Sequence, residues 1–329
     1  MPVSLLLHER ALARIGDRLR ALHLDLDFAT FNKSGRVTRD GKISAPEDVA
    51  VDYVWLSSDL NADGTQEDAF NLVLALKGAK VLQTYNAGLD HPFYKRLASK
   101  GTRISNSSAQ AVAISEYVLG QVLAVFQPIE EQRRLQAARE WKITPYREVA
   151  GTSWLIVGFG PIGREIAKRA KAFGARTSVV RRSPETSELV DEAGTLSDLP
   201  QLAPAADVIV LACPLNAETR GFAGSAFFSM LKSGTILVNI ARGALIDDAA
   251  MIRALDEGRL ATAVLDVFHE EPLPAGNPLW THPKVRLTSH TSFAGSGVRG
   301  RWDELFLENI ARYCRDEPLL NEFNPRDFP

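Results

Sequence analysis

The sequence predicts an α/β protein made of two doubly wound parallel-sheet domains. Its 329 residues suffice for about two domains of roughly 150 residues each. Short apolar runs alternate with helical patterns over the first part of the chain, and a second alternating series begins near Ser153. Such alternation is typical of a mostly parallel sheet that is covered by helices on both faces. An apolar run that leads into closely spaced glycines, early in the second series, indicates the same fold class.

The first series supplies the elements of one domain. Strands are expected at Val3–Leu7, Leu24–Phe28, Tyr53–Ser57, Val81–Tyr85 and Thr102–Ser105, and helices at Glu67–Leu76 and Pro92–Lys100. The segment Asn32–Asp48 is polar and contains two glycines and one proline, so we expect a long surface loop. By contrast, Ser108–Phe126 has few charges and predicts one long, nearly apolar helix, which must be buried.

The second series predicts another parallel sheet. Its strands are expected at Trp154–Val157, Thr177–Val180, Val208–Ala212, Thr235–Asn239, Ala263–Val267 and Val285–Leu287, and its helices at Pro161–Phe173, Ser225–Leu231 and Asp247–Glu257. The last forty residues contain one amphipathic helix, about Gly297–Arg315, and a polar tail. Because they are too few for a domain, we expect them to return and pack on the first domain.

Composition excludes several classes of protein. A net charge of −2 gives no reason to expect a nucleic-acid or membrane partner. Cys213 and Cys314 form no metal or redox motif, which fits a reducing compartment or simple packing, and the histidines show no ligand spacing, so no metal is expected. The N-terminus has no secretory pattern, and no apolar run reaches the roughly 18 residues of a membrane helix. We therefore expect a soluble, cytoplasmic protein.

Gly158, Gly160 and Gly163 form a G-x-G-x-x-G pattern between an expected strand and an expected helix. In a dinucleotide-binding turn, the first glycine permits the tight turn and the second lets the backbone approach the pyrophosphate. The third allows the helix to pack on the strand, and Pro161 suits the first helical turn, where no N–H donor is lost. The alternative is a tight strand-to-helix turn without a ligand.

The next expected strand ends in Arg181, Arg182 and Ser183, where an acidic residue would bind the adenosine ribose of NAD. A carboxylate at this position would repel a 2′-phosphate, whereas arginine binds phosphate oxygens in bidentate geometry. The sequence therefore predicts NADP as the cofactor, with NAD still possible. The alternative is that the two arginines are a solvated surface pair.

Three long phrases follow the glycine loop: "PLNAETRGFAGSAFFSMLKSGTILVNIARGALID", "GRLATAVLDVFHEEPLPAGNPLW" and "VRLTSHTS". Together they resemble the D-2-hydroxyacid dehydrogenases, closely from about Gly151 to Thr291 and more loosely in "YNAGLDHP" and "NSSAQAVAISEYVLG". The resemblance implies a flavodoxin-like substrate domain formed by residues 1–103 and 288–329. It also implies a Rossmann domain inserted at residues 104–287, and a homodimer with the long helix near its interface.

The resemblance also implies a catalytic set of Arg242, Glu271 and His290. Arginine offers a permanent multi-donor cation for a carboxylate and a ketone, and histidine can donate a proton near neutral pH. Glutamate can accept the other imidazole N–H, as the orienting acid does in catalytic triads. The chain departs from the family's usual pattern at Ser289, where a proline is common, and at Trp154, where a small residue is common.

Further contacts are expected on both domains. By resemblance Asp266 faces the nicotinamide amide, and the remaining cofactor contacts are Ile162, Cys213 and Pro214. The substrate is expected to meet Arg242, His290 and the backbone N–H groups of Asn86, Ala87 and Gly88, in a cleft between the two domains. The alternative for the last three residues is an ordinary strand-to-helix turn.

These features predict NADPH-dependent reduction of a small 2-keto acid, of the glyoxylate or hydroxypyruvate type, to the D-2-hydroxy acid. One alternative is NAD-dependent oxidation of a D-2-hydroxy acid. A second alternative, from another class, is a binding protein that uses the same fold to sense dinucleotides. The sequence does not distinguish among 2-keto acids.

Overall fold

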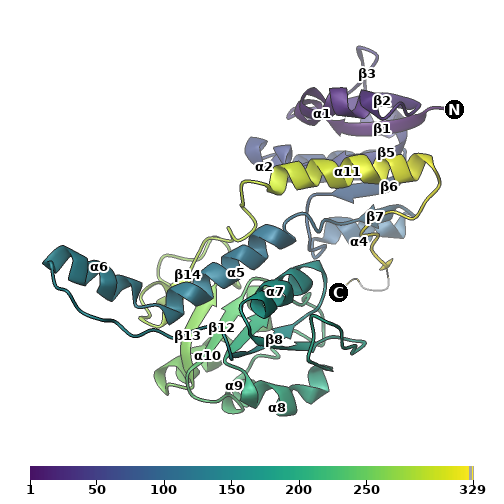
Figure 1. Cartoon of the computed structure of the whole chain (residues 1–329). Coiled ribbons are helices and arrows are strands. Elements are labelled where there is room, and N and C mark those ends of the chain that lie inside the picture. Colours follow the sequence, from purple (N-terminus) through teal and green to yellow (C-terminus); the bar gives the residue numbers. More distant parts are fainter. Residues whose placement is uncertain (326–327, 329) are drawn as a thin grey trace. The chain divides into compact units, whose positions relative to one another are not determined.

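The computed structural model describes residues 1–325 and 328, which form two compact units (Figure 1). Unit 1 comprises Met1–Gln110 and Ser296–Pro329, and unit 2 comprises Ala111–Gly295. Boundaries at residues 104 and 288 were expected from the sequence. Residue 104 lies inside a strand of unit 1, Arg103–Ser105, because its backbone pairs with Val81–Gln83. The loop after residue 288 is held by side chains of unit 2, so that boundary also falls later in the chain.

Unit 1 contains a seven-stranded sheet in the order β4-β3-β2-β1-β5-β6-β7. The strands are β1 (Val3–His8), β2 (Leu26–Phe31), β3 (Val37–Arg39), β4 (Lys42–Ser44), β5 (Ala50–Leu56), β6 (Gly78–Thr84) and β7 (Arg103–Ser105). The helices are α1 (Glu9–Ala21), α2 (Asp59–Asp63), α3 (Gln66–Ala75), α4 (Pro92–Ser99) and α11 (Val298–Cys314). Along the part of the sheet with the order β2-β1-β5-β6-β7, every pair of neighbouring strands is parallel, as the alternating pattern predicted.

The prediction of a long loop at Asn32–Asp48 was wrong. The segment contains β3 and β4, which pair antiparallel with each other and extend the sheet from β2, and a short 3-10 helix at Pro46–Asp48. Each strand has only three residues, and Val37 alone among them is buried. Such short polar strands at a sheet edge carry almost no apolar pattern, so the sequence did not indicate them.

The C-terminal helix α11 packs in the core of unit 1. Phe306 and Ile310 join the cluster formed by Leu5, Leu7 and Trp55, and the rings of Trp55 and Phe306 stack at 3.9 Å. Arg14 on α1 adds a polar tie, since its guanidinium reaches Asp303 on α11 and Asp59 on α2. The final helix therefore completes a hydrophobic core that the first part of the chain begins.

Unit 2 contains a second seven-stranded sheet, in the order β10-β9-β8-β11-β12-β13-β14, with every pair parallel. The strands are β8 (Ser153–Val157), β9 (Arg176–Val180), β10 (Glu192–Gly194), β11 (Val208–Leu211), β12 (Thr235–Asn239), β13 (Leu260–Leu265) and β14 (Val285–Leu287). The helices are α5 (Ala111–Phe126), α6 (Ile129–Ala138), α7 (Pro161–Ala172), α8 (Leu199–Leu202), α9 (Ser225–Ser229) and α10 (Asp248–Asp256).

The strand order of unit 2 reverses between β8 and β11. The chain runs outward from β8 to β9 and β10, crosses to β11, and then runs outward to β14. In open parallel sheets a ligand binds outside the carboxyl ends of the strands at such a reversal. Both adjacent strands end there, β8 at Val157 and β11 at Leu211, which places the glycine loop at the reversal.

Trp154 fills the interior of unit 2. Its side chain is 1% exposed and belongs to an apolar cluster with Val118 and Val122 of α5 and Ile166 of α7. The indole N–H donates to Thr152 Oγ1 at 3.0 Å, so its one polar atom is satisfied. This departure from the family's usual small residue is therefore an adjustment of core packing.

The nearly apolar helix α5 starts at Ala111 instead of Ser108. Ser107 accounts for the difference because its hydroxyl accepts a hydrogen bond from Ala109 N–H and donates one to Gln110 Oε1, which holds these residues in a turn. Among the described residues, no single helix is long and apolar enough to cross a membrane. Helices α5 and α6 taken together are long and apolar enough by length and composition, although they are bent by 56° at their junction. Helix α6 and strand β10 were not predicted.

Candidate active site

The glycine loop after β8 is shaped by close backbone contacts. Gly158 has φ 103°, and a Cβ there would lie 2.5 Å from Ala212 O and Cys213 N. A Cβ on Gly163 would overlap Gly158 O, whereas a Cβ on Gly160 would meet nothing within 4 Å. Gly158 thus lets the loop lie against the segment that follows β11, and Gly163 lets α7 pack on the loop. Gly160 leaves the outer side of the loop open to a ligand.

Helix α7 begins directly in this loop, at Pro161, and its N-cap residue Gly160 supplies no side-chain cap. The N–H groups of the first turn therefore keep their capacity to bind an anion, and the helix dipole adds positive potential there. Ile162 is half-buried and packs against the core cluster under the loop. These features fit the pyrophosphate of a dinucleotide.

The end of β9 carries a cluster of cations. Two guanidinium groups lie near the ring of Phe159 in the glycine loop. The distance to the ring centroid is 4.8 Å for Arg164 and 6.0 Å for Arg181. Arg181 also lies 3.7 Å from Glu185, whose side chain is 75% exposed, so this partner is largely solvated. Arg182 and Ser183 are exposed. The sequence reasoning missed Arg164, although its place directly after Gly163 puts it on the first turn of α7.

Cys213 and Pro214 follow β11 at the other side of the strand-order reversal. Cys213 is buried, and burial raises the pKa of its thiol to about 12. The thiol is therefore protonated at neutral pH and offers an apolar wall rather than a nucleophile. Pro214 is exposed, and its carbonyl accepts a hydrogen bond from Thr219 Oγ1 at 2.8 Å, which fixes the turn.

Arg242 follows β12 and is positioned by Asn239, the last residue of that strand. The Asn239 side chain donates to Arg242 O at 2.9 Å and accepts from Ala241 N–H at 3.0 Å. A Cβ on the next residue, Gly243, would overlap the backbone of Phe268. The glycine therefore lets the segment of Arg242 lie directly against the segment that precedes Glu271.

Asp266, just after β13, organises the loop that carries His290. Its side chain is fully buried, and Oδ1 accepts from Thr288 Oγ1 at 2.6 Å and from Thr291 N–H at 2.8 Å. Oδ2 accepts from Ser292 N–H at 3.0 Å. The carboxylate thus holds the loop on both sides of His290, a role that the sequence did not predict. The nicotinamide contact expected of Asp266 stays a prediction.

His290 and Glu271 form a hydrogen-bonded pair. His290 Nδ1 lies 2.7 Å from Glu271 Oε2, and Glu271 Oε1 accepts from Phe268 N–H at 2.9 Å. The His290 backbone has φ 49°, in the left-handed region, and its N–H donates to Asp266 O at 2.8 Å. Because the carboxylate only accepts, Nδ1 carries a proton, and Nε2 is the ring atom left to exchange a proton with a substrate.

Asn86, Ala87 and Gly88 follow β6 in unit 1 and are half-buried. The N–H of Asn86 is turned toward Thr84 Oγ1 at 3.3 Å, and its side-chain amide donates to Tyr94 Oη at 2.7 Å. In the described part of the chain, no acceptor is found for the N–H groups of Ala87 and Gly88. Of the three donors expected from the sequence, two are therefore uncommitted.

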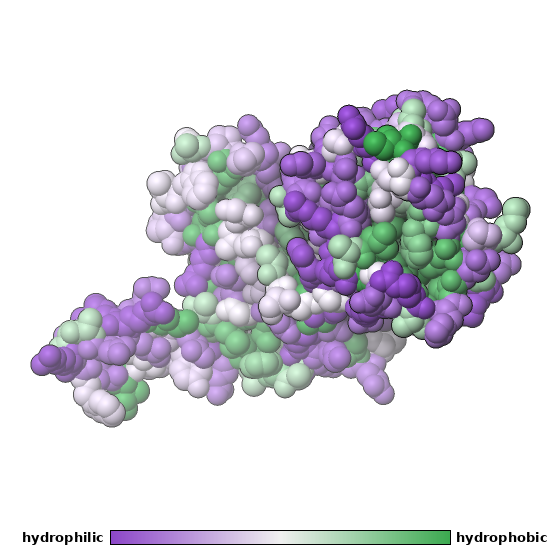
Figure 2. Space-filling model, turned by 90° about the horizontal axis from the view of Figure 1, so that it is seen from above, coloured by the Kyte–Doolittle hydropathy of each residue, from purple (hydrophilic) through white to green (hydrophobic). Residues whose placement is uncertain are grey.

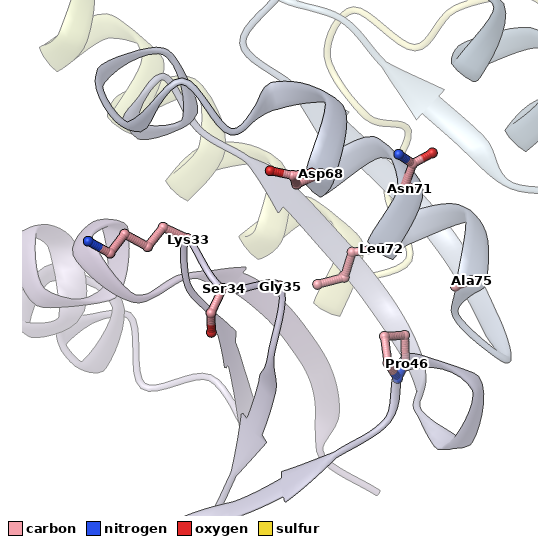
Figure 3. Close-up of a pocket in the computed structure, with 8 residues that line it drawn as sticks. All are labelled: Lys33, Ser34, Gly35, Pro46, Asp68, Asn71, Leu72 and Ala75. Carbon is pink, nitrogen blue, oxygen red and sulfur yellow. The ribbon is translucent and has the colours of Figure 1, made fainter.

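A surface hollow of about 430 Å³ in unit 1 is separate from these residues (Figure 3). It lies between the β2–β3 connection and α3, and no predicted site residue lines it. Its lining consists of Lys33, Ser34, Gly35, Pro46, Asp68, Asn71, Leu72 and Ala75.

Unit 2 therefore combines a glycine loop of the dinucleotide-binding kind with Arg242 and the carboxylate–imidazole pair of Glu271 and His290, all at the carboxyl edge of one parallel sheet. Residues 119–292 match the family model described as D-isomer specific 2-hydroxyacid dehydrogenase, NAD binding domain. The chain belongs to this family, and the resemblance inferred from its motifs is confirmed. The two-domain fold and a nicotinamide dinucleotide cofactor are confirmed with it.

Individual relatives show the range of the family. The chain is 36% identical over 251 residues to 4-methyl-2-oxopentanoate reductase A of Aspergillus oryzae, covering 74% of each chain. It is 31% identical over 223 residues to glyoxylate/hydroxypyruvate reductase A of Serratia proteamaculans, covering 65% of this chain and 70% of that protein. A solved D-isomer specific 2-hydroxyacid dehydrogenase from Xanthobacter autotrophicus Py2, in complex with NADPH and MES, has a TM-score of 0.78 and 26% identity over 99% of both chains.

The match covers other relatives less completely. The chain spans about half the length of D-3-phosphoglycerate dehydrogenases that it matches, 48% in the case of Methanocaldococcus jannaschii.

Replacing Gly243 with alanine tests the contact that brings Arg242 to the Glu271 segment. The added methyl overlaps the Phe268 backbone, so one segment must move. We expect a loss of about 1–3 kcal/mol in the free energy of unfolding, by urea titration, from overpacking. Gly276→Ala is the control, because its Cβ meets nothing within 4 Å. Equal stability of the two variants would contradict the assigned contact.

Proposed function

We propose that the protein is an NADPH-dependent reductase of a small 2-keto acid, of the glyoxylate or hydroxypyruvate type, which forms the D-2-hydroxy acid. The pair of His290 Nδ1 and Glu271 Oε2 at 2.7 Å carries this proposal. It supplies a proton donor with a fixed ring orientation at the edge of a dinucleotide-binding sheet. The names of the Serratia and Aspergillus relatives, both reductases, support the direction of reaction.

Each proposed role follows from the chemistry of ketone reduction. Bound NADPH supplies the hydride. The guanidinium of Arg242 binds the substrate carboxylate and polarises the ketone. His290 Nε2 protonates the developing alkoxide, and Glu271 stabilises the imidazolium and fixes the ring. The backbone of Asn86, Ala87 and Gly88 remains the proposed second contact for the substrate carboxylate.

NADP preference rests on the cations at the end of β9. Arg181 and Arg164 lie over one aromatic ring, and Arg182 and Ser183 are exposed beside them. Two guanidiniums lie against the ring of Phe159, and the Glu185 carboxylate near Arg181 is largely solvated, which favours an anionic ligand such as a 2′-phosphate. The NADPH in the Xanthobacter structure supports the same proposal. Pro214, Cys213 and Ile162 remain proposed cofactor contacts.

A panel of 2-keto acids assayed with NADPH and NADH tests the reaction. We expect NADPH oxidation with a small 2-keto acid and a D-configured product by chiral chromatography. Turnover only in the direction of D-2-hydroxy acid oxidation with NAD would favour the first alternative. Binding of a dinucleotide without any turnover would favour a sensing protein.

Replacing Arg181 with aspartate tests the cofactor proposal. The change removes a charge-assisted hydrogen bond and adds repulsion, so NADPH should lose at least about tenfold in kcat/KM relative to NADH. Arg259→Asp is the control, because Arg259 is exposed and its guanidinium reaches Glu257 and the Ser229 carbonyl, away from the glycine loop. Equal efficiency of the native protein with the two cofactors would refute the preference.

Replacing Glu271 with glutamine tests the proton donor. Glutamine keeps the shape and an acceptor oxygen but removes the negative charge that stabilises the imidazolium. Reduction should therefore decline with rising pH at a lower pH than in the native enzyme, in a profile of kcat/KM against pH. The neighbouring change Glu270→Gln should leave the profile in place. Superimposable profiles for native and Glu271→Gln enzyme would eliminate the proposed pairing.

We also propose a homodimer whose interface lies near the long helix α5 and includes the segment that follows α6. Trp141, Ile143 and Tyr146 are 103%, 87% and 58% exposed in the segment that follows α6. Figure 2 shows this segment at the left, with hydrophobic and hydrophilic residues side by side. Exposure of such large apolar side chains to water is unfavourable in free energy, and a partner subunit that covers them would remove this exposure. A monomer in light scattering at micromolar concentration would contradict the dimer. The cytoplasmic location expected from the sequence also stays a prediction.

A further inference from the structure

Tyr117 on α5 contacts the loop of the proposed proton donor. Its hydroxyl lies 2.7 Å from Oγ1 of Thr288, and 171 positions of sequence separate the two residues. Both residues belong to unit 2, and Tyr117 is half-buried. The contact therefore joins the long apolar helix to the base of the His290 loop, and none of the roles proposed above accounts for it.

The direction of this hydrogen bond follows from the next one. Thr288 Oγ1 also lies 2.6 Å from Asp266 Oδ1, and an ionised carboxylate can only accept. The single hydroxyl hydrogen of Thr288 therefore points to Asp266, so Tyr117 must donate to Thr288. Burial raises the pKa of Tyr117 to about 12, and the phenol thus keeps its proton at neutral pH. The three residues form a one-way chain of donors that ends on a buried carboxylate.

This chain acts on the backbone around His290. Asp266 also accepts from Thr291 N–H and Ser292 N–H, while its own carbonyl accepts from His290 N–H at 2.8 Å. His290 is held at φ 49°, in the left-handed region that few residues other than glycine adopt, although histidine does so more often than most. A loop in that conformation persists only where its surroundings over-determine it.

We propose that Tyr117 is a positioning residue, which acts through Thr288 and Asp266 to hold His290 in place for proton transfer. The inference rests on the proposed function only in that His290 is taken as the proton donor. The geometry of the loop itself is independent of the reaction. Loss of the Tyr117 hydroxyl leaves Thr288 bonded to Asp266 but removes the polarising donor behind it, and loss of the Thr288 hydroxyl breaks the chain at its centre.

Two variants of the chain test this role. Tyr117→Phe removes one donor, so kcat should fall about three- to tenfold, with KM and the Kd for NADPH within about twofold of native. Thr288→Val should lower kcat at least about tenfold, because it also removes a hydrogen bond to the buried Asp266 carboxylate. Thr288→Ser keeps the hydroxyl and should restore most of the loss. Tyr53→Phe is the matched control, since its buried hydroxyl donates to Gln83 in unit 1.

Hydrogen exchange of the His290, Thr291 and Ser292 amides measures how firmly the loop backbone is held, and it does so independently of enzyme activity. Exchange should be faster in Tyr117→Phe and Thr288→Val, and native-like in Tyr53→Phe and Thr288→Ser. Native exchange and native kcat in Tyr117→Phe would overturn the proposal, as would a lower Tm with unchanged kcat. If the native enzyme turns over no 2-keto acid while the exchange pattern holds, the proposed function fails and the control of the loop by Tyr117 stands.

Discussion

The buried carboxylate of Asp266 is the interaction on which the site depends. An ionised group that is fully excluded from water is costly unless donors surround it, and here two backbone N–H groups and one hydroxyl do so. All three donors come from Thr288, Thr291 and Ser292, which flank His290. Leaving the buried carboxylate without these donors would cost free energy. This cost favours the one backbone conformation of the loop around the proposed proton donor that supplies them.

The parallel sheet brings the other participants to the same edge. The glycine loop follows β8, Cys213 follows β11, Arg242 follows β12 and Asp266 follows β13. These residues come together because the carboxyl ends of parallel strands meet at one side of a sheet. Close packing does the remaining work: Gly163 seats α7 on the loop, and Gly243 lets the Arg242 segment lie against Phe268. Family membership and local geometry thus point to one reaction class, while the reductive direction and the keto acid are proposals.

Much of this arrangement could be predicted from the sequence, and the physical reason for each miss is specific. Apolar runs marked the buried strands because parallel sheets are covered on both faces, and long ordered phrases marked Arg242, Glu271 and His290. Strands β3, β4 and β10 have three residues each at sheet edges, which is too short for a pattern. The Tyr117–Thr288 contact and the contact of Arg181 with the Phe159 ring are tertiary, so neither has a local sequence signal.

Replacing Asp266 with asparagine tests the central claim most directly, because the side chain keeps its shape but one acceptor oxygen becomes a donor. Crystal structures and kcat of the native and variant enzymes should be compared. Residues 288–292 should lose their single backbone conformation, His290 should leave Glu271, and kcat should fall at least about tenfold. A variant with the native loop, the native His290–Glu271 contact and unchanged kcat would contradict the account.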